Sequence, residues 1–173
     1  EALEEPLKWR KASVVFVCSM GDLFHEDVTF EFVDNVMDVI SKTPQHTYQL
    51  LTKRAERMAE YFSSRLIPQN VWLGVTVEDT LTKYRIDFLR NLSAQVKFLS
   101  CEPLLCDLGE LDLEGVDWII VGGESGPIAR PMKEEWVLNI KRQAEQKSIP
   151  FFFKQWGTWS KEGVKGNKKK NGK

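Results

Sequence analysis

The chain has 173 residues, a mass of 20.0 kDa and 42% hydrophobic residues, which is enough for one domain with a buried core and excludes a wholly disordered chain. Its 24 basic and 25 acidic residues give a formal net charge of -1, so no global field would recruit nucleic acid or an anionic membrane. No apolar run approaches the roughly 20 residues of a membrane span, and the N-terminus does not have the form of a signal peptide. We therefore expect a cytoplasmic protein that makes no membrane contact.

The three cysteines, Cys18, Cys101 and Cys106, are too few and too odd in number for a disulfide framework. This count fits a reducing compartment. The simplest interpretation is that the three cysteines are small, buried hydrophobic side chains. The sequence begins at Glu1 without an initiator methionine, so we expect a processed or truncated polypeptide.

Short apolar strands alternate with helical patterns along most of the chain. Residues 1–11 are predicted to be a polar lead-in, and residues 104–115 a loop. Thr29 or Asp27 can cap the first helix, and one face of the third is predicted to carry Leu81, Tyr84, Phe88 and Leu89. The strands are predicted at residues 14–17, 47–51, 71–75, 95–99, 117–121 and 150–153, and the helices at residues 30–40, 55–62, 81–89 and 133–147.

The strands begin at intervals of about 21 to 33 residues, the length of a strand, a crossover helix and two loops. This spacing predicts an α/β domain with parallel strands. A doubly wound sheet usually has a glycine-rich turn after its first strand, whereas only Gly21 follows here, so we favour a parallel (β/α) barrel of about six strands, partial or TIM-like. It would span residues 1–159. The Lys/Gly/Asn-rich tail at 160–173 is expected to be disordered, with at most weak nucleic-acid contact.

In either architecture the functional side chains lie at the carboxyl ends of the strands. The residues that follow the six strands are mostly ionisable or hydrogen-bonding. As catalytic candidates we take Lys53, Glu78 and Glu102. The substrate-binding candidates are Ser19, Asp22, His25, Arg54, Asp79, Arg130, Lys154, Gln155 and Trp156.

Several of these residues have two interpretations. Together, Glu78, Asp79, Glu102 and Glu124 could bind Mg²⁺ or Mn²⁺, but Asp79 could equally cap a helix while Glu102 or Glu124 pairs with Lys53, Arg54 or Lys154. His25 could transfer protons or be an ordinary surface histidine. The Gly122-Gly123 turn could present backbone N–H groups to an anion, with Arg130 as a second donor, or be merely a tight turn. Trp156 could stack on a base or pack at the rim. No spacing identifies a metal ligand set in this chain.

Seven segments in order resemble an uncharacterised bacteriophage-associated family: residues 6–9, 19–25, 49–54, 72–79, 100–104, 121–126 and 152–157. Members of that family usually carry, upstream, a three-cysteine segment similar to the one that holds a [4Fe-4S] cluster in radical S-adenosylmethionine enzymes. The resemblance implies a (β/α) barrel with its cofactors at the strand carboxyl ends. The segment is absent here and the three cysteines do not match its spacing, so this chain alone supports neither cofactor. A longer gene product could hold both.

Carried over by position, the resemblance implies that S-adenosylmethionine is contacted by Gly122, Gly123, Glu124 and Ser125. Nearby, for cofactor or substrate, it places Ser100, Glu102, Lys53, Arg54 and Glu78. Our first functional hypothesis is the barrel portion of a radical S-adenosylmethionine-like enzyme of unknown substrate. The second is a divalent-metal-dependent hydrolase that uses the strand-end carboxylates. The third is a non-catalytic interaction module for a protein encoded by a neighbouring gene.

Overall fold

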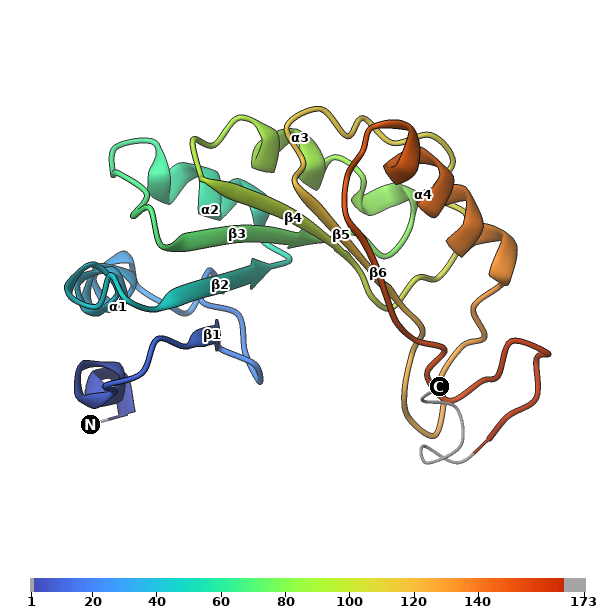
Figure 1. The fold of residues 1–173 in the computed structure, drawn as a ribbon, viewed down its shortest axis with the longest axis horizontal. Coiled ribbons are helices and arrows are strands. Elements are labelled where there is room, and N and C mark those ends of the chain that lie inside the picture. Colours follow the sequence, from blue (N-terminus) through green and yellow to red (C-terminus); the bar gives the residue numbers. More distant parts are fainter. Residues whose placement is uncertain (1, 167–173) are drawn as a thin grey trace.

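In a computed structural model that describes residues 2–166, the chain forms one sheet of six parallel strands in the order β1-β2-β3-β4-β5-β6 (Figure 1). The strands are β1 (Val14–Val17), β2 (Thr47–Thr52), β3 (Val71–Thr76), β4 (Val96–Cys101), β5 (Trp118–Gly122) and β6 (Phe151–Gln155). The helices are the 3-10 helices η1 (Ala2–Lys8) and η2 (Thr80–Thr82) and the α-helices α1 (Phe30–Lys42), α2 (Ala55–Phe62), α3 (Arg85–Arg90) and α4 (Glu134–Gln146).

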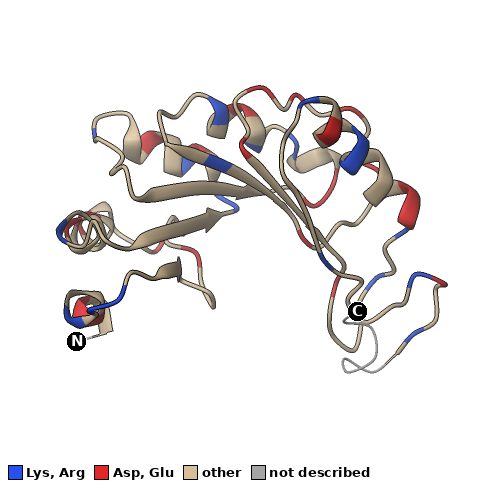
Figure 2. Cartoon of the chain, viewed as in Figure 1, with Lys and Arg blue, Asp and Glu red and all other residues tan. Residues whose placement is uncertain are grey.

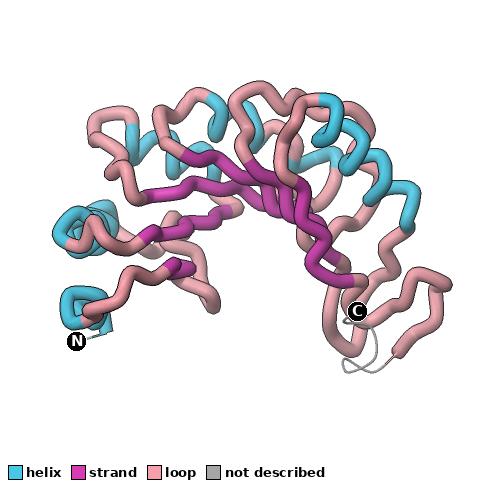
Figure 3. Tube along the Cα trace, viewed as in Figure 1, coloured by secondary structure: helices cyan, strands magenta, loops and turns pink. Residues whose placement is uncertain are grey.

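Sequential strand order with no reversal gives a curled sheet whose helices all cover its convex side (Figures 1 and 3). There is no topological switch point, so the doubly wound alternative is wrong. The predicted partial parallel barrel is confirmed. Within residues 2–166, β1 and β6 are not paired with each other, so these six strands form an open half-barrel and not a closed, TIM-like one.

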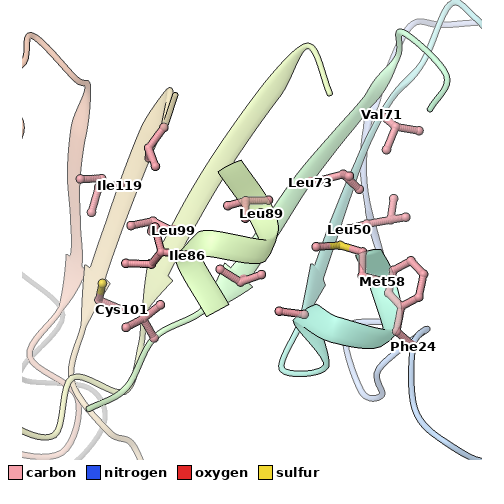
Figure 4. Close-up of a cluster of buried hydrophobic side chains, with 14 of the residues drawn as sticks. Phe24, Leu50, Met58, Val71, Leu73, Ile86, Leu89, Leu99, Cys101 and Ile119 are labelled. Carbon is pink, nitrogen blue, oxygen red and sulfur yellow. The ribbon is translucent and has the colours of Figure 1, made fainter. Parts of the chain in front are cut away.

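The main core lies between the convex side of the sheet and the helices (Figure 4). Alternate strand residues face this core because successive side chains of a strand point to opposite faces. The strands contribute Leu50, Leu73, Leu99 and Ile119, each at most 2% exposed, and the helices contribute Met58, Ile86 and Leu89. This layer holds the six strands in their curvature.

The strands begin within one residue of their predicted positions, and Thr29 caps α1 by accepting a hydrogen bond from the backbone N–H of Phe32 at 3.3 Å. The predicted face of the third helix is right for Phe88 and Leu89, which pack in or against the core, and wrong for Leu81 and Tyr84. Asp79 and Thr82 form a capping box that starts the short η2, and the chain begins a new helix at Arg85. As a result Leu81 is 82% exposed, whereas Ile86 and Leu89 are buried.

The prediction that the N-terminal residues form an unpacked lead-in is also wrong. These residues form η1, which is fixed by the buried side chain of His46. The imidazole Nδ1 accepts from the backbone N–H of Ser13 at 3.2 Å, Nε2 lies 3.3 Å from the carbonyl oxygen of Pro6, and the Trp9 ring meets the imidazole edge-on. A side chain from the loop before β2 therefore holds the start of the chain.

At the other end, Trp159 and Lys165 form an antiparallel bridge, and the Ser160 N–H donates to the Val164 carbonyl at 2.9 Å. The first part of the predicted tail therefore turns back on itself. The rest of it, with Lys168, Lys169 and Lys170, lies outside the described residues, and a domain boundary at residue 159 stays a prediction. None of the helices described is long and apolar enough to cross a bilayer.

Candidate binding site at the carboxyl edge of the half-barrel

Asp22, in the loop after β1, joins that loop to the end of β2. Its Oδ1 accepts from Thr52 Oγ1 at 2.7 Å and from the Phe24 N–H at 3.0 Å, and its Oδ2 accepts from the Lys53 N–H at 3.0 Å and from Arg54 Nη1 at 3.3 Å. A carboxylate with four donors is fully satisfied as an ion. Asp22 therefore fixes the position from which Lys53 and Arg54 leave the sheet.

Glu78, after β3, lies between two cations. Lys53 Nζ contacts its Oε1, and Arg85 Nη1 lies 3.4 Å from its Oε2 while also donating to the Thr76 carbonyl at 2.8 Å. The sequence analysis missed Arg85, because an arginine at the start of a short helix has no distinctive sequence signal. Arg85 places a second positive charge next to the Glu78 carboxylate.

Glu102 connects the ends of three strands. It follows β4, and its carboxylate accepts from Lys154 Nζ at 2.8 Å and from Gln155 Nε2 at 3.1 Å, both on β6. Gln155 Nε2 also lies 3.4 Å from the Ser125 hydroxyl, in the loop after β5. A Cβ atom at Gly122 would lie 3.0 Å from this carboxylate, so the glycine leaves room for Glu102.

Glu124 and Arg130 form a forked ion pair within the loop after β5. Arg130 Nε and Nη2 and its backbone N–H each donate to the carboxylate at 2.8 Å. These hydrogen bonds to the arginine side chain and backbone lower the pKa of Glu124 to about 2. The carboxylate is therefore ionised at neutral pH and engaged within its own loop.

Gly123 and Gly157 bring the loops after β5 and β6 into backbone contact. A Cβ atom at Gly123 would lie 2.1 Å from the Trp156 carbonyl oxygen, and one at Gly157 would lie 2.2 Å from the Glu124 carbonyl oxygen. The Thr158 N–H donates to that Glu124 carbonyl at 2.9 Å. Close approach within the chain therefore accounts for the glycine at position 123 without a ligand.

A cavity of about 670 Å³ opens at the ends of β1 and β2, a volume in the range of small-molecule sites. Phe16, Leu51 and Thr76 contribute to its wall. It also brings together Ser19, Asp22, His25, Lys53, Arg54 and Lys154 from the predicted set. Lys154 belongs to β6, so residues from both edge strands of the sheet, β1 and β6, line the cavity.

Over residues 1–173 the chain matches the family described as "Protein of unknown function (DUF5131)". The chain belongs to this family. No curated protein and no solved structure matches it. Membership of the DUF5131 family specifies no reaction, phage association or cofactor.

Other predicted residues of this DUF5131 chain lie apart from the cavity. Asp79 caps η2, and Trp156 packs on Phe153 with ring centroids 5.0 Å apart, as the simpler interpretations expected. His25, in contrast, lines the cavity, and its Nδ1 accepts from the Asp27 N–H at 3.3 Å. Among residues 2–166 no three His, Cys, Asp or Glu side chains form a group able to hold a metal ion.

Cys18 and Cys101 of the DUF5131 chain do not have the properties of nucleophiles. Burial raises the pKa of Cys101 to about 12, and partial burial together with the charge of Asp22 raises the pKa of Cys18. A reactive cysteine needs a lowered pKa, because the thiolate is the nucleophile. The observed shifts have the opposite sign.

Proposed function

We propose that the carboxyl edge of the half-barrel binds S-adenosylmethionine, and that the chain is the cofactor-binding part of a radical S-adenosylmethionine-like protein of unknown substrate. The observation that carries the proposal is the cluster around Glu102. Four polar residues from the ends of three strands meet there: Glu102, Ser125, Lys154 and Gln155.

The methionyl end of S-adenosylmethionine carries an ammonium and a carboxylate. Glu102 and Ser125 offer acceptors for the ammonium, and Lys154 and Gln155 offer donors for the carboxylate. Ser100 lies on β4, before Glu102, and is buried. These residues would bind and orient the cofactor, and the cofactor itself would supply the group-transfer or radical chemistry.

The thiols of this chain do not fit a [4Fe-4S] cluster. Three thiolates would have to converge, whereas Cys101 is buried in the core and no group of three ligating residues is found in the described part of the chain. No role of these residues depends on a cluster bound by the three cysteines. The proposal concerns the S-adenosylmethionine site alone.

The divalent-metal hydrolase has less support. Asp79 caps η2, and Glu124 is held by Arg130. A metal ion would have to displace these partners before it could bind the carboxylates.

The test is isothermal titration calorimetry of the 173-residue chain with S-adenosylmethionine. We expect saturable binding, and a loss of about tenfold in affinity for Glu102→Gln, because a charge-assisted hydrogen bond contributes roughly 1.5–3 kcal/mol. The matched control is Glu145→Gln, which removes a carboxylate that also pairs with a lysine but lies on α4. Absence of binding by the unmodified chain, or equal affinities for Glu102→Gln and Glu145→Gln, would refute the proposal.

A further inference from the structure

The concave face of the half-barrel carries a series of aromatic rings. Strand residues that alternate with the helix-facing core point to this side, and none of them belongs to the core cluster under the helices. Phe16 on β1 and Phe152 on β6 are 44% and 51% exposed. Trp72 on β3 and Trp118 on β5 are half-buried. Exposed aromatic area of this kind marks a binding surface.

The rings at the centre of this face are held in place by one another. Phe98 lies over Gly74, where a Cβ atom would come within 2.4 Å of its ring. Its centroid is 5.7 Å from that of Trp118, which is 6.3 Å from that of Trp72. Phe98 is only 1% exposed and is therefore buried. The half-buried Trp72 and Trp118, held by Phe98 and by each other, form a fixed aromatic platform, flanked by the more exposed Phe16 and Phe152.

Cations face the solvent along the carboxyl rim of this platform. In the pair Lys53–Glu78 the side chains are 46% and 15% exposed, and in the pair Lys154–Glu102 they are 53% and 17% exposed. In the pairs Arg54–Asp22 and Arg130–Glu124 the arginine side chain is likewise more exposed than the carboxylate. The inner carboxylates hold the cations in position, so an approaching anion meets positive charge first.

The charges lie around the platform and not on it. Figure 2 shows the strands almost free of charged residues, with Lys, Arg, Asp and Glu on the helices and loops. Lys154 is the exception at the carboxyl end of the concave face, and it lines the same cavity as Phe16, Lys53 and Arg54. An aromatic ring and three cations therefore border one hollow.

We propose that the concave face binds single-stranded nucleic acid, with bases stacked on the aromatic rings and phosphates held by the rim cations Lys53, Arg54, Arg130 and Lys154. Stacking requires exposed base faces, which a duplex hides, and every base offers one, so little sequence preference is expected. The residues of this surface are other than those of the lysine-rich tail. The proposal does not rest on S-adenosylmethionine binding.

The test is fluorescence anisotropy of the whole chain with a labelled oligodeoxythymidine about 12 nucleotides long. We expect saturable binding with quenching of tryptophan fluorescence, because Trp72 and Trp118 are part of the platform. Phe16→Ala and Phe152→Ala should each weaken binding about fivefold or more, the loss expected for one stacked base. Phe32→Ala is the matched control, since Phe32 is a similarly exposed phenylalanine on α1, and it should leave binding unchanged.

The contribution of the rim is read from the salt dependence. Lys53→Gln and Lys154→Gln should each reduce the slope of log affinity against log salt by about 0.7, the value for one phosphate contact on a single strand. Lys141→Gln, on α4, is the control with similar exposure and should not change the slope. Circular dichroism of each variant separates lost binding from lost folding.

Three outcomes would overturn the proposal: equal affinity for duplex and single strand, equal affinity for thymidine monophosphate and the oligonucleotide, or binding that survives Phe16→Ala and Phe152→Ala. A fourth is complete loss of binding when Lys168, Lys169 and Lys170 are changed to Gln, which would assign it to the tail. A negative S-adenosylmethionine titration would leave the nucleic-acid result standing.

Discussion

The two faces of the sheet both carry large apolar side chains and differ in what covers them. Leu73 and Leu99 face the helices and are fully buried. Their neighbours Trp72 and Phe98 point to the concave side, where Trp72 is half-buried and Phe98 is only 1% exposed. On the convex side the helices exclude water. On the concave side no described helix covers the strands, so Phe16, Trp72, Trp118 and Phe152 keep exposed area. The same hydrophobicity thus stabilises the fold on one face and offers a binding platform on the other.

The largest difference in stability is expected between truncations on the two faces of the sheet. Leu73→Ala should lower the free energy of unfolding by about 2–5 kcal/mol, because it leaves a cavity in the core. Phe16→Ala should cost less than about 1 kcal/mol, because its ring is 44% exposed. Urea unfolding of the two variants measures both. Equal losses would mean that the concave face is as much a core as the convex one.

A smaller effect is expected where the concave face itself is tightly packed. Gly74→Ala should cost roughly 1–3 kcal/mol, because the added Cβ would enter the Phe98 ring. In a Phe98→Ala background the same change should cost much less, because the obstructing ring is gone. A double-mutant cycle by chemical denaturation gives the coupling. Additive losses would show that Phe98 does not rest on Gly74.

The smallest effect is local and depends on pH. The folded pKa of Glu124 is about 2, below its ordinary value of 4.5, because Arg130 stabilises the carboxylate. The contribution of this pair is therefore fully present above about pH 4.5 and is lost as the pH falls toward 2. An NMR titration of the Glu124 side chain checks the value. In Arg130→Gln the pKa should return toward 4.5, and an unchanged low value would contradict the role of the arginine.

Much of the site was predictable because each strand changes from apolar to polar at its carboxyl end. That pattern identified Asp22, Lys53, Glu78 and Glu102, and pairing of Glu102 with Lys154 was one of the two interpretations left open. The platform was missed although its signal is present: once the strands are known, alternation puts an aromatic residue on the face opposite the core. Without the structure nothing indicates which face the helices cover.

The sequence by itself determined the number, order and type of the strands, because local hydrophobic period and turn residues fix these over a few residues. Only the tertiary structure decided that the six described strands form an open half-barrel, that Arg85 lies beside Glu78, and that Gly123 is needed for the approach of Trp156. These features depend on contacts between segments far apart in the chain. Local periodicity carries no information about which distant residues meet.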